Sequence, residues 1–142
     1  MENSKRFIEY VETNISNRNQ IIPIELYHSA IKNTAFVDKE SYGSYYRFDS
    51  SYYDYVTQHS SVKGYEGLVY VDRLILDIDK HSFDNDTLYE TVKAYIGQCL
   101  EFGLKKEDIN LWYSGNGFHI ELMNAFGFQP AKNVHEKVKQ TL

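Results

Sequence analysis

The stretch LWYSGNGFHIEL, residues 111–122, constrains the fold of this chain more than any other segment. A hydrophobic run ends at residue 113, and a second one spans residues 118–122. Between them, residues 114–117 contain two glycines in four positions. Short apolar runs separated by a glycine-rich turn predict two strands joined closely in space.

The turn has two interpretations, which the residues alone leave open. Asn116-Gly117 is a favoured pair for a two-residue β-hairpin, and His119 is then an ordinary strand residue. Alternatively, Gly115 and Gly117 let the backbone approach a ligand, and successive N–H groups form an anion-binding nest. In that case Ser114 and Asn116 add side-chain donors, and His119 can reach a bound phosphate.

A second motif, LILDID at residues 74–79, has the alternation of a strand that ends in acidic residues. Asp77 and Asp79 are two positions apart, so both are expected on one face of the strand. The residues expected on the other face, toward a core, are Leu74, Leu76 and Ile78. Paired carboxylates suit Mg²⁺, which often uses one or two of them together with substrate phosphates. The alternative is a solvated strand end without a ligand.

Local patterns along the rest of the chain predict the other elements. We expect helices over residues 4–15, 50–59, about 84–102 and from 133 onward. Strands are expected over 45–48 and 68–79 (one or two), and over 24–31, where the mixed pattern favours a strand but also allows a helix. Loops are expected over 16–20, 33–43, 63–67 and 105–108. The capping residues expected are Asp49 or Ser50, Asp84 or Asp86, Gly103, and Asn133 with Glu136. The apolar face expected for the third helix comprises Leu88, Val92, Tyr95, Ile96, Cys99 and Phe102.

These elements predict an α+β fold in one domain of 142 residues. We expect an N-terminal α/β unit over about residues 1–67, followed over about 68–142 by a sheet with helices packed on it. A strand, a crossover helix and a second strand form a βαβ-type layout. This layout would place the carboxylates of Asp77 and Asp79 and the imidazole of His119 on one face of one sheet. We expect Trp112 in the core.

Charge and cysteine content limit the class of function. The net charge of −5 argues against a protein that coats DNA by charge alone. It does not exclude an acidic site whose metal ions meet phosphate. Cys99 is the only cysteine, which favours a reducing compartment such as the cytoplasm. No apolar run approaches membrane-spanning length, so no membrane partner is expected.

Together the two motifs resemble those of the archaeo-eukaryotic primase superfamily, the primase-polymerases, and in particular its phage and plasmid members. The first motif of that family is a hydrophobic run followed by Asp-x-Asp, here residues 74–79. Its second motif is a serine and glycine turn ending in histidine, here residues 114–119. The resemblance covers about residues 24–125, and residues 64–81 and 111–122 carry most of it.

The resemblance implies template-directed nucleotidyl transfer in DNA replication, on an RRM-like sheet beside an N-terminal α/β unit. Asp77 and Asp79 would hold catalytic Mg²⁺ or Mn²⁺ ions. The residues implied to bind the incoming nucleotide are Ser114, Gly115, Asn116, Gly117 and His119, with Arg47 and Lys80 as further template or phosphate contacts. The implied partners are a single-stranded DNA template, nucleoside triphosphates and a helicase domain or subunit.

One departure from the family concerns its third motif, a further acidic residue on a later strand. After His119 the only acids are Glu121, which would share the side of His119, and Glu136 in the last helix. We therefore expect an N-terminal part of a longer catalytic domain. Such a chain would show little synthesis alone and would become active when extended past Leu142 to the next acidic strand.

Two other functions stay open. One is a non-catalytic module of the same fold that binds nucleotides or nucleic acid. The other is a metal-dependent nuclease of the replication-initiator kind, which usually needs paired histidines and a nucleophilic tyrosine. The FHIEL segment supplies one histidine and has Glu121 at the position of the second, which counts against the nuclease.

Overall fold

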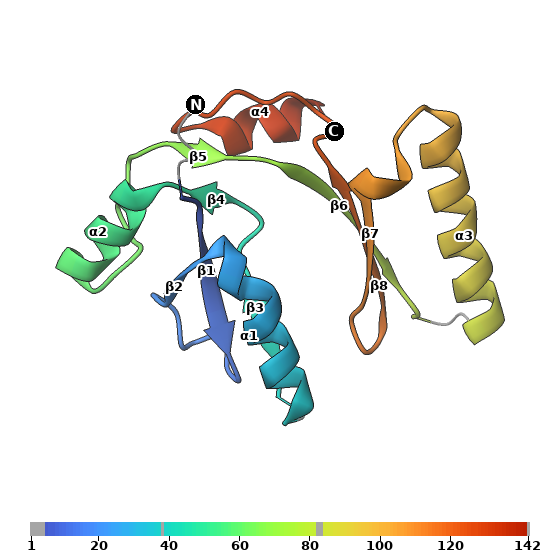
Figure 1. Ribbon diagram of the computed structural model, residues 1–142, viewed down its shortest axis with the longest axis horizontal. Coiled ribbons are helices and arrows are strands. Elements are labelled where there is room, and N and C mark those ends of the chain that lie inside the picture. The colour runs from blue at the N-terminus through green and yellow to red at the C-terminus, as the bar shows by residue number, and fades with distance from the viewer. Residues whose placement is uncertain (1–4, 38, 82–83, 142) are drawn as a thin grey trace. The chain divides into compact units, whose positions relative to one another are not determined.

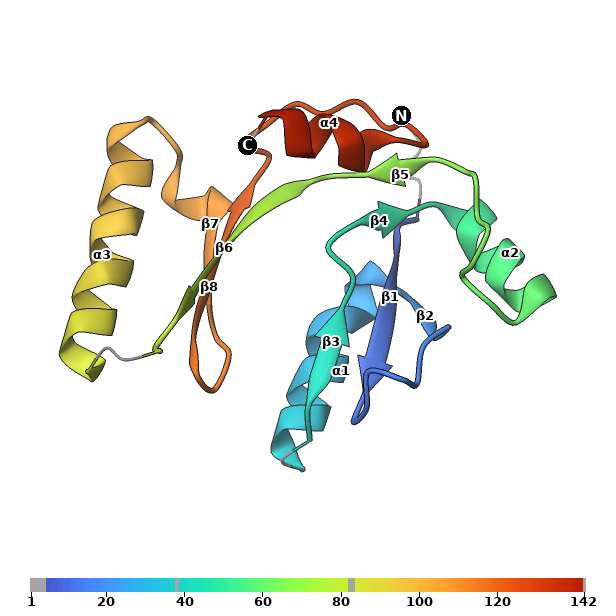
Figure 2. The ribbon, with the colours of Figure 1, turned by 180° about the vertical axis from the view of Figure 1, so that it is seen from behind.

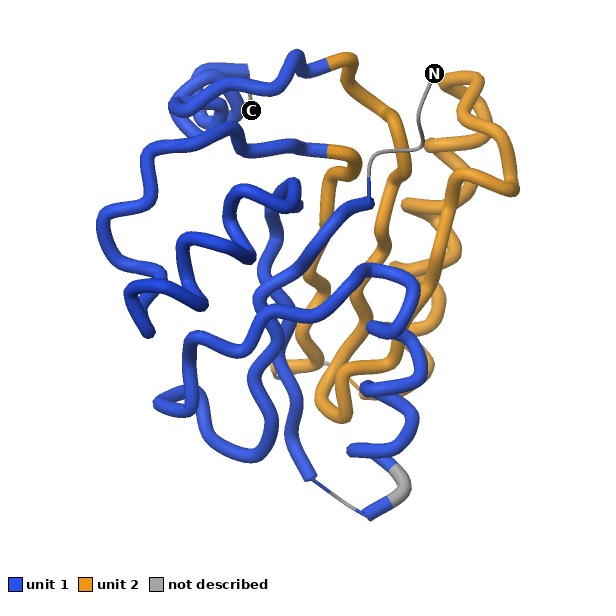
Figure 3. The backbone as a smooth tube through the Cα atoms, turned by 60° about the vertical axis from the view of Figure 1, so that its left-hand side comes forward, with its two compact units in different colours: residues 1–71, 128–142 blue, residues 72–127 orange. Residues whose placement is uncertain are grey.

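The computed structural model describes residues 5–37, 39–81 and 84–141. The chain divides into two compact units (Figure 3). Unit 1 comprises Met1–Val71 and Phe128–Leu142, and unit 2 comprises Asp72–Gly127. Helices and antiparallel sheets occur in both, so the fold class is α+β, as predicted.

Unit 1 is built on an antiparallel sheet (Figure 1). Its strands are β1 (Phe7–Glu12), β2 (Ile21–Pro23), β3 (Ser41–Gly43), β4 (Arg47–Phe48) and β5 (Val69–Tyr70). The order is β2-β1-β4-β5, and β3 pairs with the second half of β1. Strand β4 lies within residues 45–48, where the sequence predicts a strand.

The helix expected over residues 4–15 is wrong: the described part of this stretch contains strand β1, and residue 4 lies outside the described residues. Five consecutive residues of β1, Phe7 to Val11, are buried. Phe7 stacks on Tyr53, and the Tyr10 hydroxyl donates to Ala30 O. Phe7 and Tyr10 lie on opposite faces of the strand, so other elements pack on both of its faces. A buried strand of this kind has no two-residue alternation, and its apolar run can be mistaken for a helix face.

The strand expected over residues 24–31 is also wrong, because helix α1 (Ile24–Phe36) occupies it and the start of the expected 33–43 loop. Pro23 precedes the helix with a φ of −58°, an angle that suits a helix start. Figure 2 shows α1 beside β1 and β3. The Tyr10 hydroxyl, from β1, donates to Ala30 O at 3.3 Å. This tertiary packing decides a segment whose own pattern is ambiguous.

Helix α2 (Ser50–His59) begins as predicted, with the Asp49 carboxylate accepting from Ser51 N at 2.9 Å. Phe48 and Tyr52 stack with ring centroids 3.8 Å apart. The last helix, α4 (Val134–Thr141), starts directly after Asn133, as predicted. Its position differs from the expected division, because α4 belongs to unit 1. The buried residues that hold it there are Val71, Val134 and Val138.

Unit 2 is a three-stranded sheet with one helix on it (Figures 1 and 2). Its elements are β6 (Arg73–Asp79), α3 (Asn85–Glu101), the 3-10 turn η1 (Lys106–Asp108), β7 (Ile109–Tyr113) and β8 (Gly117–Met123). The order is β6-β8-β7, and β8 is antiparallel to both neighbours. Strands β6 and β7 are therefore parallel, connected through α3, with β8 between them.

Helix α3 has the predicted ends, because Asp84 accepts from Thr87 N at 2.7 Å and Gly103 follows with a φ of +93°. Its buried residues, Leu88, Val92 and Cys99, all belong to the predicted apolar face. The prediction is wrong for two other members of that face, because Tyr95 is 45% exposed and Phe102 is 87% exposed. A three-stranded sheet covers a narrower stripe of the helix than the spacing of apolar residues suggests.

Candidate functional site

Strand β6 places its two acidic residues on the face of the sheet that α3 does not cover. Leu74, Leu76 and Ile78 pack against the core of unit 2. Because successive side chains alternate across a strand, Asp77 and Asp79 lie on the opposite face, as predicted. This core includes Ile120 of β8, which is fully buried. Apolar alternation in β6 and β8 therefore fixes which side chains reach the other face.

The register of the sheet brings His119 directly beside Asp77. Asp77 pairs with His119 across β6 and β8, and His119 pairs with Trp112 across β8 and β7. The His119 Nε2 atom lies 3.1 Å from Asp77 Oδ1. Their side chains are 42% and 58% exposed, so both can be reached by a ligand. Asp79 pairs with Gly117 one step along the same face. The predicted grouping of the two acids with His119 on one face is confirmed.

The glycine turn is a β-hairpin, but its tip is Gly115-Asn116 and not Asn116-Gly117. Gly115 has a φ of +94°, and Ser114 N donates to Gly117 O at 3.0 Å across the turn. Glycine at the first central position is the signature of a type II′ turn. Lys80 N donates to Asn116 O at 2.9 Å, which joins the turn to the end of β6. The turn is thus held next to the acidic end of that strand.

Glu121 is on this face too, but its carboxylate already has two partners. Arg73 Nη1 donates to Oε1 at 2.8 Å, and Trp112 Nε1 donates to Oε2 at 3.0 Å. The Glu121 side chain is only 12% exposed. Burial alone would lower the pKa of Arg73, but the hydrogen bonds and charges of Asp72 and Glu121 outweigh it and raise that pKa. Glu121 is therefore part of an ion-pair network.

Trp112 was expected in the core, and that expectation is wrong. It shares the face of His119, opposite the α3 core, and is only partly exposed. The run INLWY has large apolar residues on both of its faces, so alternation could not assign one. The register against His119 was the missing signal, because a directly opposed residue lies on the same face.

The two further residues expected to contact template or phosphate, Arg47 and Lys80, belong to different units. Arg47 is in unit 1 and only 2% exposed, and its Nη1 donates to Ser44 O at 2.7 Å. A phosphate contact would require Arg47 to leave this position. Lys80 directly follows β6 and is half-buried beside the turn, so its position is compatible with a ligand on this face.

The donor set suits a hard divalent cation that takes part of its coordination from a substrate. Within residues 5–37, 39–81 and 84–141, no group of three or more His, Cys, Asp and Glu side chains is arranged to hold a metal ion. Asp77 and Asp79 offer two neighbouring carboxylates, which is the number that Mg²⁺ commonly uses beside substrate phosphates and water. Mg²⁺ or Mn²⁺ therefore fits these residues only together with a phosphate ligand.

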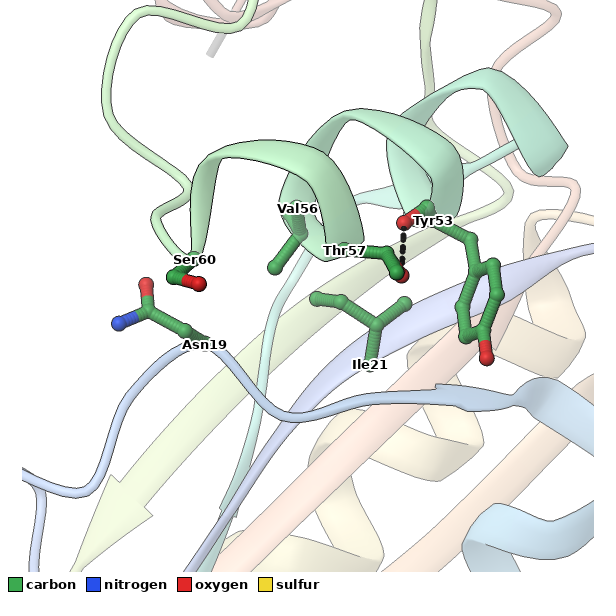
Figure 4. Close-up of a pocket in the computed structure, with 6 residues that line it drawn as sticks. All are labelled: Asn19, Ile21, Tyr53, Val56, Thr57 and Ser60. Carbon is green, nitrogen blue, oxygen red and sulfur yellow. Dashed lines mark hydrogen bonds between the residues drawn. The ribbon is translucent and has the colours of Figure 1, made fainter.

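Unit 1 contains a pocket of about 360 Å³ between α2 and residues 19–21, which lead into β2 (Figure 4). It is lined by Asn19, Ile21, Tyr53, Val56, Thr57 and Ser60. Thr57 Oγ1 donates to Tyr53 O at 2.8 Å, so this hydroxyl serves the helix backbone. The lining carries no carboxylate, imidazole or amine, and it offers no chemistry comparable to the face of unit 2.

Comparison with protein-family models, with curated proteins and with solved structures finds no match to this chain. In the part of the chain that the structure describes, no helix has the length and apolar character to cross a membrane.

Proposed function

We propose that this chain is the nucleotide-binding catalytic part of a primase-polymerase, a template-directed nucleotidyltransferase of DNA replication. The observation that carries the proposal is the face of unit 2 on which Asp77, Asp79 and His119 lie together, with His119 Nε2 3.1 Å from Asp77 Oδ1. Its substrates are nucleoside triphosphates paired to a single-stranded DNA template, and its compartment is the cytoplasm. A helicase domain or subunit is the proposed partner in replication.

Each residue has a distinct role in this proposal. Asp77 and Asp79 are the ligands for Mg²⁺ or Mn²⁺, which neutralises phosphate charge and polarises the reacting oxygens when bound. Asp77 beside His119 orients its imidazole, and the ring contacts a phosphate oxygen of the nucleotide. The Ser114–Gly117 turn lies at the end of the same face and limits where the phosphates can lie.

The proposed reaction extends a primer by one nucleotide. The oxygen of the primer 3′-hydroxyl forms a bond to the α-phosphorus of the triphosphate. The bond from that phosphorus to the oxygen bridging to the β-phosphate breaks, and pyrophosphate leaves with the bonding electrons. The hydroxyl proton passes to solvent. No oxidant or reductant is needed, and the two carboxylates and the imidazole supply positioning and charge stabilisation.

A second candidate, a non-catalytic nucleotide-binding module, is favoured by one observation. Both carboxylate oxygens of Glu121 are engaged by Arg73 and Trp112, so Glu121 does not supply a third acid. Fixing two metal ions in line with the attacking and leaving oxygens takes more than two carboxylates. We therefore expect metal-dependent nucleotide binding by this chain and little synthesis.

Calorimetry with ATP and Mg²⁺ or Mn²⁺ tests the binding step. The native chain should bind the nucleotide only with the metal ion present. Asp77→Asn/Asp79→Asn should weaken this binding by at least about tenfold, as should His119→Ala, because each removes a charge-assisted contact. Asp54→Asn, an exposed carboxylate on α2, is the control and should leave the affinity unchanged. Equal affinity in the native chain and the double variant would contradict the proposed site.

Incorporation of labelled nucleotide on a single-stranded template separates the two candidates. Any synthesis should disappear with Asp77→Asn, because that carboxylate is required for the chemical step. Incorporation by the native chain, even at a low rate, would favour the primase-polymerase over the non-catalytic module. Incorporation that is unaffected by Asp77→Asn would refute the primase-polymerase proposal.

A further inference from the structure

Trp112 extends the Asp77–His119 pair into a row that crosses all three strands of unit 2. Asp77 in β6, His119 in β8 and Trp112 in β7 are directly opposed neighbours in the register. Neighbouring strands lie about 4.8 Å apart, so the row spans about 10 Å. Its composition changes along this length, from carboxylate to imidazole to indole.

The indole is held in place by an ion-pair network. Trp112 Nε1 donates to Glu121 Oε2 at 3.0 Å, and Arg73 Nη1 donates to Glu121 Oε1 at 2.8 Å. Arg73 Nε in turn donates to Asp72 Oδ1 at 2.8 Å. Trp112 is directly opposed to His119, and Glu121 is two residues beyond His119 in β8. The hydrogen bond between Trp112 and Glu121 therefore turns the indole toward Glu121 on the sheet face. A ring that is fixed before binding loses little conformational entropy when a ligand stacks on it.

We infer that Trp112 is the stacking surface for the nucleobase of the bound nucleoside triphosphate, and that Glu121 and Arg73 are positioning residues for its indole. The inference rests on the proposed function, because the phosphates must lie near Asp77 and His119 for the base to reach β7. Aromatic side chains on a sheet face are well suited to stacking bases.

This role defines the substrate class as nucleoside triphosphates with any of the four bases. Every base has a π face, so stacking accepts all four bases and leaves base choice to the template. The nucleotide is therefore recognised at its two ends by chemistry independent of sequence, phosphate at one end and aromatic ring at the other. Glu121 accordingly serves the indole and not a metal ion.

Trp112 is the only tryptophan of the chain, so its fluorescence reports on this position alone. ATP with Mg²⁺ and inorganic tripolyphosphate with Mg²⁺ are titrated into the native chain, with binding measured in parallel by calorimetry. ATP should quench the emission, whereas tripolyphosphate should bind without quenching it, because it has no base. Trp112→Leu should weaken ATP binding about tenfold and leave the tripolyphosphate affinity unchanged. Tyr95→Leu, an exposed aromatic on α3, is the matched control and should change neither affinity.

The outcomes distinguish this inference from the proposed function. ATP that binds by calorimetry without altering the emission, and with equal affinity for Trp112→Leu, would overturn the stacking role and leave the phosphate site intact. Equal quenching by ATP and tripolyphosphate would also overturn it, since the indole would then sense phosphate. Absence of binding by both ligands would overturn both proposals. The fluorescence titration uses the native chain, so it decides the question even if Trp112→Leu does not fold.

Discussion

Gly117 shows how tightly β6 and β8 approach each other at the acidic end of the sheet. A Cβ atom built on Gly117 would lie 2.2 Å from Ile78 O and 2.8 Å from Asp79 Cα. Both are backbone atoms, so a side chain at this position cannot be accommodated by a change of rotamer. The absence of a side chain at Gly117 therefore allows Asp79 to pair with it.

Gly117→Ala should accordingly destabilise unit 2 by about 2 kcal/mol, because the added methyl group forces the two strands apart. Urea unfolding followed by circular dichroism measures this change. Gly97→Ala is the matched control, since nothing lies within 4 Å of a Cβ at that position in α3. It should raise stability by up to about 1 kcal/mol, because alanine favours a helix over glycine. A Gly117→Ala chain as stable as the native one would show that the strands are not held so closely.

At the scale of secondary-structure elements, helix caps are local signals with local causes. The Asp84 carboxylate accepts from Thr87 N at 2.7 Å at the start of α3. This backbone hydrogen bond holds the pKa of Asp84 below its ordinary value of 3.8. A lowered pKa means that the folded chain favours the ionised carboxylate. The stabilisation by the cap is therefore complete above pH 3.8 and disappears as the pH falls through the lower folded-state value.

The measured consequence is a pH-dependent difference between two chains. The native chain should be more stable than Asp84→Ala at neutral pH, and this difference should shrink as the pH is lowered below 3.8. Urea unfolding at a series of pH values measures it. Asp84→Asn keeps an acceptor but cannot titrate, so its advantage over Asp84→Ala should stay constant with pH. If the stability difference between the native chain and Asp84→Ala grew as the pH fell, the pKa of Asp84 would be raised by folding and not lowered.

The same contrast between local and distant causes explains which elements the sequence predicts. The starts of α2 and α3 depend on Asp49 and Asp84, whose hydrogen-bond partners lie two and three residues further along the chain. Their positions were therefore predicted. Strand β1 and helix α1 depend on burial against other elements, and there the local pattern predicted the wrong type.

In the candidate site, too, the features with local causes were predicted and those with distant causes were not. Alternation predicted the common face of Asp77 and Asp79, and the crossover layout predicted that His119 would join them. The partners of Glu121, and the face of Trp112, were not predicted, because they depend on the register of three strands. No local spacing in residues 109–123 records that register.

At the scale of the whole molecule, each unit has its own hydrophobic core. Ile120 is fully buried in a cluster formed entirely by residues of unit 2. Ile8 is fully buried in β1 of unit 1. The chain enters unit 2 after Val71 and leaves it at Gly127, so α4 returns to the unit where the chain began.

Ile120→Ala should lower the free energy of unfolding by about 2–5 kcal/mol, through lost apolar burial and the cavity that remains. Hydrogen exchange should show faster opening of amides in β6, β7, β8 and α3, with amides of β1 unchanged. Ile8→Ala should give the reverse pattern. Equal acceleration in both units for either variant would show that the two cores open as one.

The register of unit 2 also sets an order of events during folding. His119 and Trp112 are seven residues apart in sequence (112 to 119) and meet across a hairpin, whereas Asp77 and His119 are 42 residues apart (77 to 119). Hairpins form in microseconds, and contacts between distant segments form later because more chain entropy is lost. We expect the aromatic half of the row to assemble before the acidic half. Under the proposed function, a chain at that stage would already have the indole proposed to stack on the base but not the two carboxylates proposed to hold the metal ion, so the pairing of β6 would complete the proposed site.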